Sequence, residues 1–354
     1  MGISQRIGEW TAAAAVCVTA VVSIASSGHG APPERPDPVD RRAVRSLLAQ
    51  YARPDSVPHP EDNRYTAERR ALGKLLFFDA RLSGTGDVSC ASCHDPARSY
   101  GDGRARAVGV TRTTLGRRTP TVLNTAYAPA LFWDGRAETL EQQALGPIEA
   151  AGEMGLPLPV MVRRMNAVAG YRARFAAAYG SDSITPALVA KAIAQFERTV
   201  NSTPAPFDRW AAGDDRAIEE SAKRGFVLFN GKASCASCHG GWRFTDDSFH
   251  DIGVPGADSG RARVVPGVEV LEFAFKTPTL RNVVERAPYM HDGSERTLAE
   301  VVELYDRGGR ARRASLSPFI KPLGLTRQEK DDLVAFLRTL SSRDTVSVPT
   351  HFPR

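Results

Sequence analysis

Apolar residues recur at three- and four-residue intervals along much of this chain, a spacing typical of helices that bury one face. The clearest stretches are residues 66–78, 185–200, 221–230 and 326–340, with a shorter one near 42–51. Two of them carry start signals, because Pro186 follows Thr185 and because Thr326 and Glu329 form a capping-box pattern. Strand-like alternation is scarce, and residues 264–275 are the only candidate ribbon. The pattern therefore predicts a mainly α fold.

Part of this pattern occurs twice. Aligning Gly73 with Gly225 places Gly-Lys-Leu-Leu-Phe beside Gly-Phe-Val-Leu-Phe, and the same pentapeptide, Cys-Ala-Ser-Cys-His, follows each stretch. This weak internal repeat predicts two tandem domains joined near residues 201–215. The predicted segments are a signal peptide at 1–30, an irregular lead-in at 31–54, and domains at 55–205 and 206–345.

The repeated pentapeptide is the attachment signature of a c-type haem. Its two cysteines form thioethers to the porphyrin, and its histidine becomes an axial ligand of the iron. A redox disulfide gives no reason for the same adjacent histidine twice, and a zinc site normally brings its cysteine pairs within about 20 residues. We therefore expect two tandem cytochrome c-like domains, each with one covalently bound haem c, held by Cys90, Cys93 and His94 in the first and by Cys235, Cys238 and His239 in the second.

Composition agrees with an exported haem protein. The chain has 354 residues and only five cysteines, of which the fifth, Cys17, lies in an apolar run that follows Arg6. That run predicts a secretory signal and a periplasmic protein with no membrane span after cleavage, and a retained anchor is the alternative. The formal charge of +6 suits steering of acidic partners. Basic residues are scattered without interleaved aromatics, which argues against nucleic-acid binding.

Several further motifs follow one another in a fixed order at residues 75–83, 118–121, 132–136, 146–149, 153–154, 275–282 and 287–293. Together with the two pentapeptides they resemble the bacterial di-haem cytochrome c peroxidases, and in particular their MauG-like subgroup. The resemblance spans roughly residues 55–341, which is nearly the whole mature chain. Phe-Trp-Asp-Gly-Arg at 132–136, between two haem motifs, is its most specific part.

The resemblance implies roles for individual residues. The N-terminal haem would react with hydrogen peroxide, and the C-terminal haem would handle electrons. Trp133 matches the tryptophan between the two haems, although taken alone it would be an ordinary core indole. Gln143, Pro147 and Glu153 match the distal pocket of the peroxide-reactive haem. Cleavage of the peroxide bond needs a base such as Glu153 to take up a proton and return it.

Two departures from the family pattern carry the functional prediction. Residues 95–119 contain no histidine, so we expect the first haem to be five-coordinate and open. Where peroxidases of the family have a methionine ligand to the second haem, this chain has Tyr305. Tyrosinate stabilises oxidised iron, whereas a thioether favours ferrous iron. Met290 is the rival ligand, since it has the right atom type at the wrong spacing.

Other matches concern ions and hydrogen bonds near the haems. The family often holds calcium through an asparagine, but Arg118 occupies that position, which argues against calcium, although Arg286 and Pro288 offer carbonyls. Arg281 is a candidate partner for a haem propionate. His250 and His291 are expected to form hydrogen bonds near the second haem.

The resulting expectation is a peroxidase-family enzyme that reacts with hydrogen peroxide at the His94 haem. Oxidising equivalents would pass through Trp133 to a haem held by His239 and Tyr305, and the pair would oxidise a partner protein. Two alternatives stay open. One is detoxification of hydrogen peroxide with electrons from a small cytochrome or copper protein, and the other is a di-haem electron carrier without catalysis.

Overall fold

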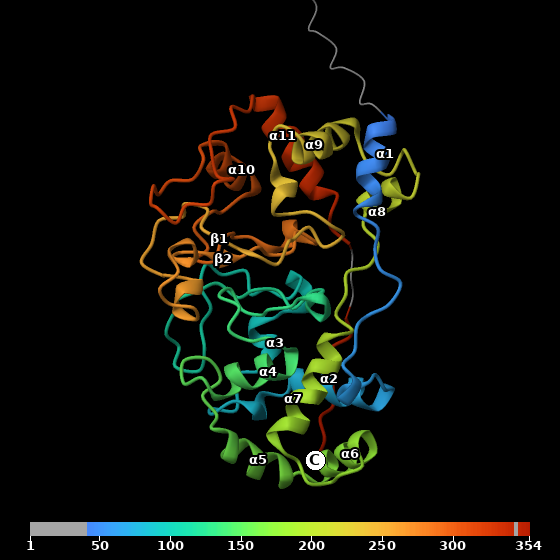
Figure 1. Cartoon of the computed structure of the whole chain (residues 1–354). Coiled ribbons are helices and arrows are strands. Elements are labelled where there is room, and N and C mark those ends of the chain that lie inside the picture. Colours follow the sequence, from blue (N-terminus) through green and yellow to red (C-terminus); the bar gives the residue numbers. More distant parts are fainter. Residues whose placement is uncertain (1–40, 343–345) are drawn as a thin grey trace, which may run out of the picture. The chain divides into compact units, whose positions relative to one another are not determined.

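Helices and short turns make up most of the chain in the computed structural model, which describes residues 41–342 and 346–354 (Figure 1). The predicted signal segment and the first ten residues of the lead-in, 31–40, lie outside the described residues. The α-helices are α1 (Arg41–Ala49), α2 (Ala67–Phe78), α3 (Cys90–Cys93), α4 (Leu140–Glu149), α5 (Leu158–Asn166), α6 (Ala169–Tyr179), α7 (Pro186–Glu197), α8 (Pro206–Ala211), α9 (Glu220–Asn230), α10 (Leu298–Asp306) and α11 (Arg327–Arg338). The short strands β1 (Phe249–His250) and β2 (Phe275–Lys276) pair antiparallel.

The helices expected from the apolar pattern are present as α1, α2, α7, α9 and α11, and the prediction of a mainly α fold is confirmed. The start signals act as expected, because the Thr185 hydroxyl accepts from the backbone of Leu188 and Thr326 forms its capping box. The ribbon expected at 264–275 is wrong. Turns occupy most of that stretch, since Pro266 lacks an amide hydrogen and Gly267 adopts a φ of +80°.

Two hydrophobic cores form around two equivalent helix pairs, α2 with α7 and α9 with α11. In each pair a glycine lets the backbones approach closely. A Cβ atom on Gly73 would lie 1.8 Å from the carbonyl oxygen of Ala192, and one on Gly225 would lie 2.0 Å from that of Asp332. The glycines aligned in the sequence repeat therefore hold the same place in two equivalent halves.

The two ends of the described chain cross between these halves (Figure 1). Helix α1 contributes Val44 and Leu48 to the second core, beside α8. The last residues return to the first half, where Lys74 Nζ donates to Ser347 at 2.8 Å and the Gly170 amide donates to the Arg354 carbonyl at 2.8 Å. Each half is thus completed by a segment from the far end of the chain.

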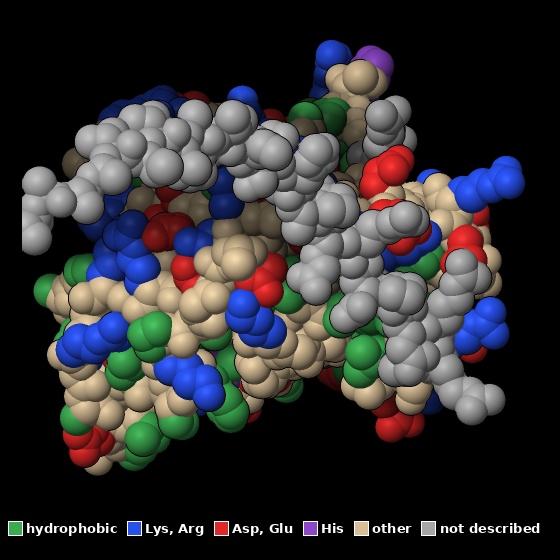
Figure 2. Space-filling view, turned by 90° about the horizontal axis from the view of Figure 1, so that it is seen from above, with side chains coloured by type: hydrophobic (Ala, Val, Ile, Leu, Met, Phe, Trp, Pro, Cys, Tyr) green, Lys and Arg blue, Asp and Glu red, His purple; other side chains and the backbone are tan. Residues whose placement is uncertain are grey.

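The surface view agrees with a mixed distribution of charge. On the face drawn in Figure 2, Lys and Arg side chains lie dispersed among acidic and apolar ones. Within the described residues, every helix is too short or too polar to serve as a membrane span.

Candidate functional site

A cavity of about 1250 Å³ runs between the two halves and receives side chains from both pentapeptides. Its lining also brings together the residues expected to attach the haems, to ligate their iron and to form the distal pocket and the bridge. These residues are Cys90, Cys93, His94, Trp133, Gln143, Pro147, Glu153, Cys235, Cys238, His239, Met290 and Tyr305. The volume exceeds the roughly 300–1,000 Å³ of a pocket for one small ligand, so there is room for more than one group.

Each pentapeptide presents its histidine in a form that suits metal binding. His94 Nδ1 lies 3.2 Å from the carbonyl oxygen of Tyr100, and His239 Nδ1 lies 2.8 Å from that of Phe244. These contacts fix both rings and leave Nε2 of each for a ligand in the cavity. Burial lowers the pKa of both imidazoles, which keeps them neutral.

The cysteines of the pentapeptides complete a donor set that fits haem c. All four thiols are free of disulfides and only partly buried. Two thiols and one oriented imidazole therefore face the same cavity in each half, as attachment and ligation of one haem require. Residues Cys90, Cys93 and His94 would hold the first haem, and their counterparts Cys235, Cys238 and His239 would hold the second.

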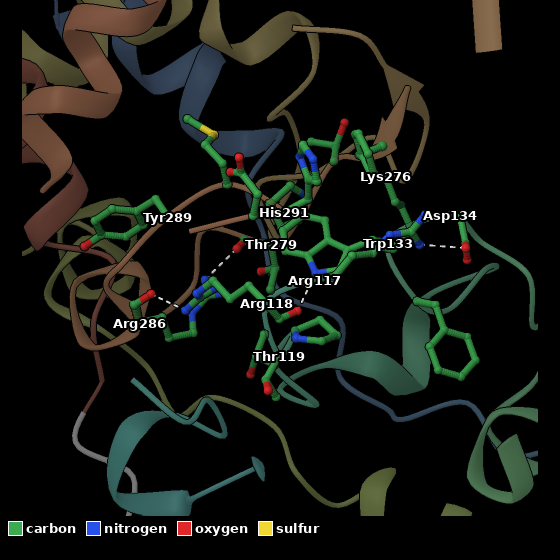
Figure 3. A pocket seen from close by; sticks show the side chains of 18 of the residues that line it. Arg117, Arg118, Thr119, Trp133, Asp134, Lys276, Thr279, Arg286, Tyr289 and His291 are labelled. Carbon is green, nitrogen blue, oxygen red and sulfur yellow. Dashed lines mark hydrogen bonds and ion pairs between the residues drawn. The ribbon is translucent and has the colours of Figure 1, made fainter. Parts of the chain in front are cut away.

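Trp133 lies in the cavity wall where the two halves meet (Figure 3). Its side chain is 8% exposed, and its indole nitrogen donates to the Arg118 carbonyl at 2.8 Å. Its own carbonyl accepts from the Lys276 amide at 2.8 Å, which ties the motif to β2. The indole is therefore held rigidly in contact with elements of both halves.

An aromatic group from the second half packs beside this indole. The ring of His291 stands edge-on to Trp133, with centroids 6.5 Å apart, and stacks on Phe275 at 3.6 Å. Burial lowers the pKa of His291 to about 4, so the ring is neutral. Its backbone carbonyl accepts from the Arg118 amide at 2.7 Å, so Arg118 links both rings.

Helix α4 and the turn after it supply the candidate distal residues of the first half. Gln143 and Pro147 are one helical turn apart, so they face the cavity together. The Glu153 backbone is held by the adjoining loop, whose Val110 amide donates to the Glu153 carbonyl at 2.8 Å. Burial raises the pKa of Glu153 despite the opposing charge of Arg136. A carboxyl group of raised pKa is a suitable acid–base group.

Helices α4 and α10 are equivalent parts of the two halves. Each begins after a short bridge and a threonine cap, Thr139 in the first half and Thr297 in the second. The residue eight positions after each cap lines the cavity: Pro147 in the first half and Tyr305 in the second. A proline side chain has no ligand atom, whereas a phenol has one. The sequence signal for this equivalence is the similarity of residues 131–147 to residues 289–305, which lies outside the repeat around the pentapeptides.

The two rival ligands of the second half occupy different kinds of position. Tyr305 lies on α10 close enough to Cys235 and Cys238 for their charges to affect it, and burial raises the pKa of its phenol. Within the described residues its hydroxyl has no hydrogen-bond partner. Met290 also lines the cavity, at the turn position that Phe132 holds in the first half. The helix equivalence therefore supports Tyr305.

The structure corrects the expectation for Arg281. This side chain is 0% exposed and does not line the cavity, because its two terminal nitrogens donate to Asp208 at 2.7 and 2.8 Å. It is thus already paired and is not a propionate partner. His250 forms the expected hydrogen bond, with Nε2 2.8 Å from Asp246. This bond, together with the neighbouring Cys238 thiol, raises the pKa of His250 to about 10. His291 stacks on Phe275 instead.

Arg118 fills the place at which a calcium ion would be expected (Figure 3). Its buried guanidinium donates to the Arg286 carbonyl, one of the two carbonyls left as calcium ligands. Among the described residues, no carboxylate accepts a hydrogen bond from Arg118. Burial and the nearby charge of Arg118 lower the pKa of the Arg286 guanidinium to about 9. Two cations and one occupied carbonyl do not fit a calcium site.

Calcium removal should therefore leave the protein unchanged. We expect a strong chelator to alter neither the visible spectrum of the di-haem protein nor its thermal midpoint, since Arg118 already supplies a positive charge there. Replacement with asparagine, Arg118→Asn, is the matched comparison because it removes the guanidinium and adds a carbonyl ligand. A spectral change that calcium restores in the unmodified protein would contradict this assignment.

Two attachment sequences that face one cavity in tandem helical halves are characteristic of a di-haem c-type cytochrome. Known proteins agree with this class. Residues 67–216 match the family described as di-haem cytochrome c peroxidase, and residues 222–341 match cytochrome c. The methylamine utilization protein MauG of Methylorubrum extorquens is 51% identical over 302 residues, covering 84% of this chain and 85% of that protein.

Other relatives carry peroxidase names. The cytochrome c551 peroxidase of Nitrosomonas europaea is 36% identical over 281 residues, covering 78% of this chain and 80% of its own. The crystal structure of a MauG-like protein associated with microbial copper homeostasis superimposes with a TM-score of 0.76 at 34% identity, covering 82% of this chain and 95% of that one. The chain belongs to the di-haem cytochrome c peroxidase family and is a peroxidase-type oxidoreductase with haem c.

Proposed function

We propose that this protein reacts with hydrogen peroxide in its first half and oxidises a partner protein from its second half. The proposal rests on one observation: Pro147 and Tyr305 occupy equivalent positions in the cavity wall, one in each half. At this position the first half has a proline, which offers no ligand atom, while the second half has a phenol that would hold the second haem together with His239. The first haem would then stay accessible to peroxide, and the second would gain a donor that favours oxidised iron.

The residues of the first half prepare the peroxide site. Haem iron, when bound, supplies the redox-active centre at which the peroxide oxygen–oxygen bond breaks. Glu153 accepts the proton of the inner peroxide oxygen and returns it to the departing oxygen. Gln143 faces the same space and orients the peroxide by a hydrogen bond. Pro147 has no ligand atom, so it leaves the peroxide site free of a competing protein ligand.

Trp133 connects the two sites. Its indole is fixed through the Arg118 and Lys276 contacts and lies edge-on to His291, so an aromatic bridge joins the halves. We infer that oxidising equivalents pass through this indole to the site of His239 and Tyr305. A cavity filled by two haems leaves little space for a large buried substrate, so the oxidised group belongs to a protein docked outside. The apolar run after Arg6 supports a periplasmic location.

The proposal is tested by mixing the protein first with peroxide and then with electron donors, while the spectra of both haems are recorded. Ferric protein mixed with stoichiometric peroxide is expected to show spectral changes at both haems without prior reduction. The reacted protein should then persist in the presence of a small reduced cytochrome and decay with an added oxidisable protein. Rapid turnover with the cytochrome, and a clearly positive potential at the second haem, would support simple peroxide detoxification instead. An unchanged spectrum after peroxide would leave only electron carriage.

A further inference from the structure

Glu197, the last residue of α7, is a buried carboxylate for which the proposed reaction has no use. Its side chain lines the cavity on the side of the first pentapeptide, close enough to raise the pKa of the Cys90 thiol. The residue is 4% exposed, and its Oε2 atom is buried without a hydrogen-bond partner. An unpaired buried carboxylate costs free energy unless it binds a proton, so its presence calls for an explanation.

Within the described part of the chain, no side chain forms an ion pair with Glu197, and the charge of Arg198 offsets its burial only in part. The adjacent Arg198 is committed elsewhere, since its two terminal nitrogens donate to Glu141 on α4 at 2.7 and 2.9 Å. Because Glu197 lies at the C-terminal end of α7, the negative end of the helix dipole also disfavours a charged carboxylate there. Of the elements near it, α4 brings Glu141 and α3 brings Cys90, while α2 and α5 bring no ionisable group that shifts it. Burial therefore raises the pKa of Glu197 to about 8.

The second half shows that the fold does not require a carboxylate at this position. Glu197 follows Phe196, which packs against the close-approach glycine of α2, and Leu337 follows Phe336, which packs against the equivalent glycine of α9. Leu337 lines the cavity in the second half as Glu197 does in the first. The two halves thus place an apolar and an ionisable side chain at equivalent points of the wall.

We propose that Glu197 stores a proton for the first haem site, binding one proton when the haem held by Cys90 and Cys93 gains one electron. The electron goes to the iron and the proton to a carboxylate oxygen, so the net charge in the cavity is unchanged. Added negative charge in a medium of low dielectric favours protonation of a nearby carboxylate. Loss of the electron releases the proton. The proposal requires the bound haem, and does not depend on the peroxide reaction or on a partner protein.

Redox titration of the di-haem protein on both sides of pH 8 tests this proposal, because the pKa of Glu197 is about 8. We expect the potential of the first haem to fall with rising pH by up to about 59 mV per unit, the value for one proton per electron. Glu197→Gln and Glu197→Leu should flatten this dependence, and the leucine copies the residue of the second half. Glu149→Gln, an exposed carboxylate on α4, should keep it.

A second measurement does not depend on any variant folding. The infrared difference between reduced and oxidised wild-type protein should contain the carbonyl band of a newly protonated carboxylic acid, shifted in ²H₂O. Absence of that band would overturn the proposal, and so would an unchanged slope in both Glu197 variants. Loss of the slope only in Glu153→Gln would assign the proton to Glu153 instead. Each readout is independent of peroxide consumption, so failure here is distinguishable from failure of the proposed function.

Discussion

Replacing Tyr305 with phenylalanine should abolish oxidation of a partner protein while leaving the first haem reactive. The change removes the only atom by which α10 could close the second site, and it keeps the ring that packs in the cavity wall. We expect low-temperature EPR of the ferric protein to lose the signal that a second haem held by both His239 and Tyr305 would give. The signal of the first haem should remain, because Pro147 and His94 are untouched. Reaction with stoichiometric peroxide at that haem should remain as well.

The methionine variant tests the same position in the opposite direction. Tyr305→Met supplies a thioether, which favours ferrous iron, so the potential of the second haem should rise by about 0.1 V or more within the roughly 0.8 V range set by axial ligands. Electrons from a small cytochrome should then enter readily, which converts the protein to a peroxide scavenger. Tyr127→Phe, which removes a hydroxyl outside the cavity lining, serves as control. An unchanged EPR spectrum in Tyr305→Phe would transfer the ligand role to Met290.

The sequence predicts the local features of this fold well because they depend on neighbouring residues. Caps at Thr185 and Thr326, together with the helical period of apolar residues, specify where helices begin and which face is buried. The pentapeptides likewise contain within five residues all the donors that attach one haem. Such features can be recognised without knowing what the chain contacts elsewhere.

Features that depend on distant contacts could not be predicted in this way. Helix α1 packs in the second core and the last residues pack on the first, but neither segment carries a signal for its destination. The ion pair of Arg281 could not be predicted because its partner, Asp208, lies far away in sequence. Similarly, the role of Arg118 depends on a carbonyl that only the folded chain brings near.

The equivalence of the two halves could be predicted from the sequence only in part. It is present in the sequence as Asp-Gly followed by Thr-Leu at residues 134–140 and 292–298, but only the structure shows that both copies face one cavity. Aligning Pro147 with Tyr305 shows that only the second half offers a ligand atom at this position. The same comparison of the halves distinguishes Glu197 from Leu337, and such differences support the separate roles that we propose for the two halves.

Glu153 is the residue whose loss should slow the peroxide reaction most. Glu153→Gln keeps the size of the side chain but cannot take up the peroxide proton, and loss of an acid–base group costs about 10²–10⁴-fold in rate. Stopped-flow mixing of ferric protein with peroxide, followed in the visible spectrum of the first haem, measures this effect. Glu149→Gln, also a glutamate of the first half but exposed and outside the cavity, should react at the wild-type rate.

The pH dependence provides a separate test of the same assignment. Burial raises the pKa of Glu153, so its carboxylate takes up a proton at a higher pH than an ordinary glutamate does. The base form is then lost as the pH falls through this raised pKa. The wild-type rate should therefore begin to decline at a pH above the pKa of an ordinary glutamate. Glu153→Gln should lose that decline together with the rate. If Glu153→Gln reacts slowly but its rate still declines at low pH as in the wild type, another group removes the proton.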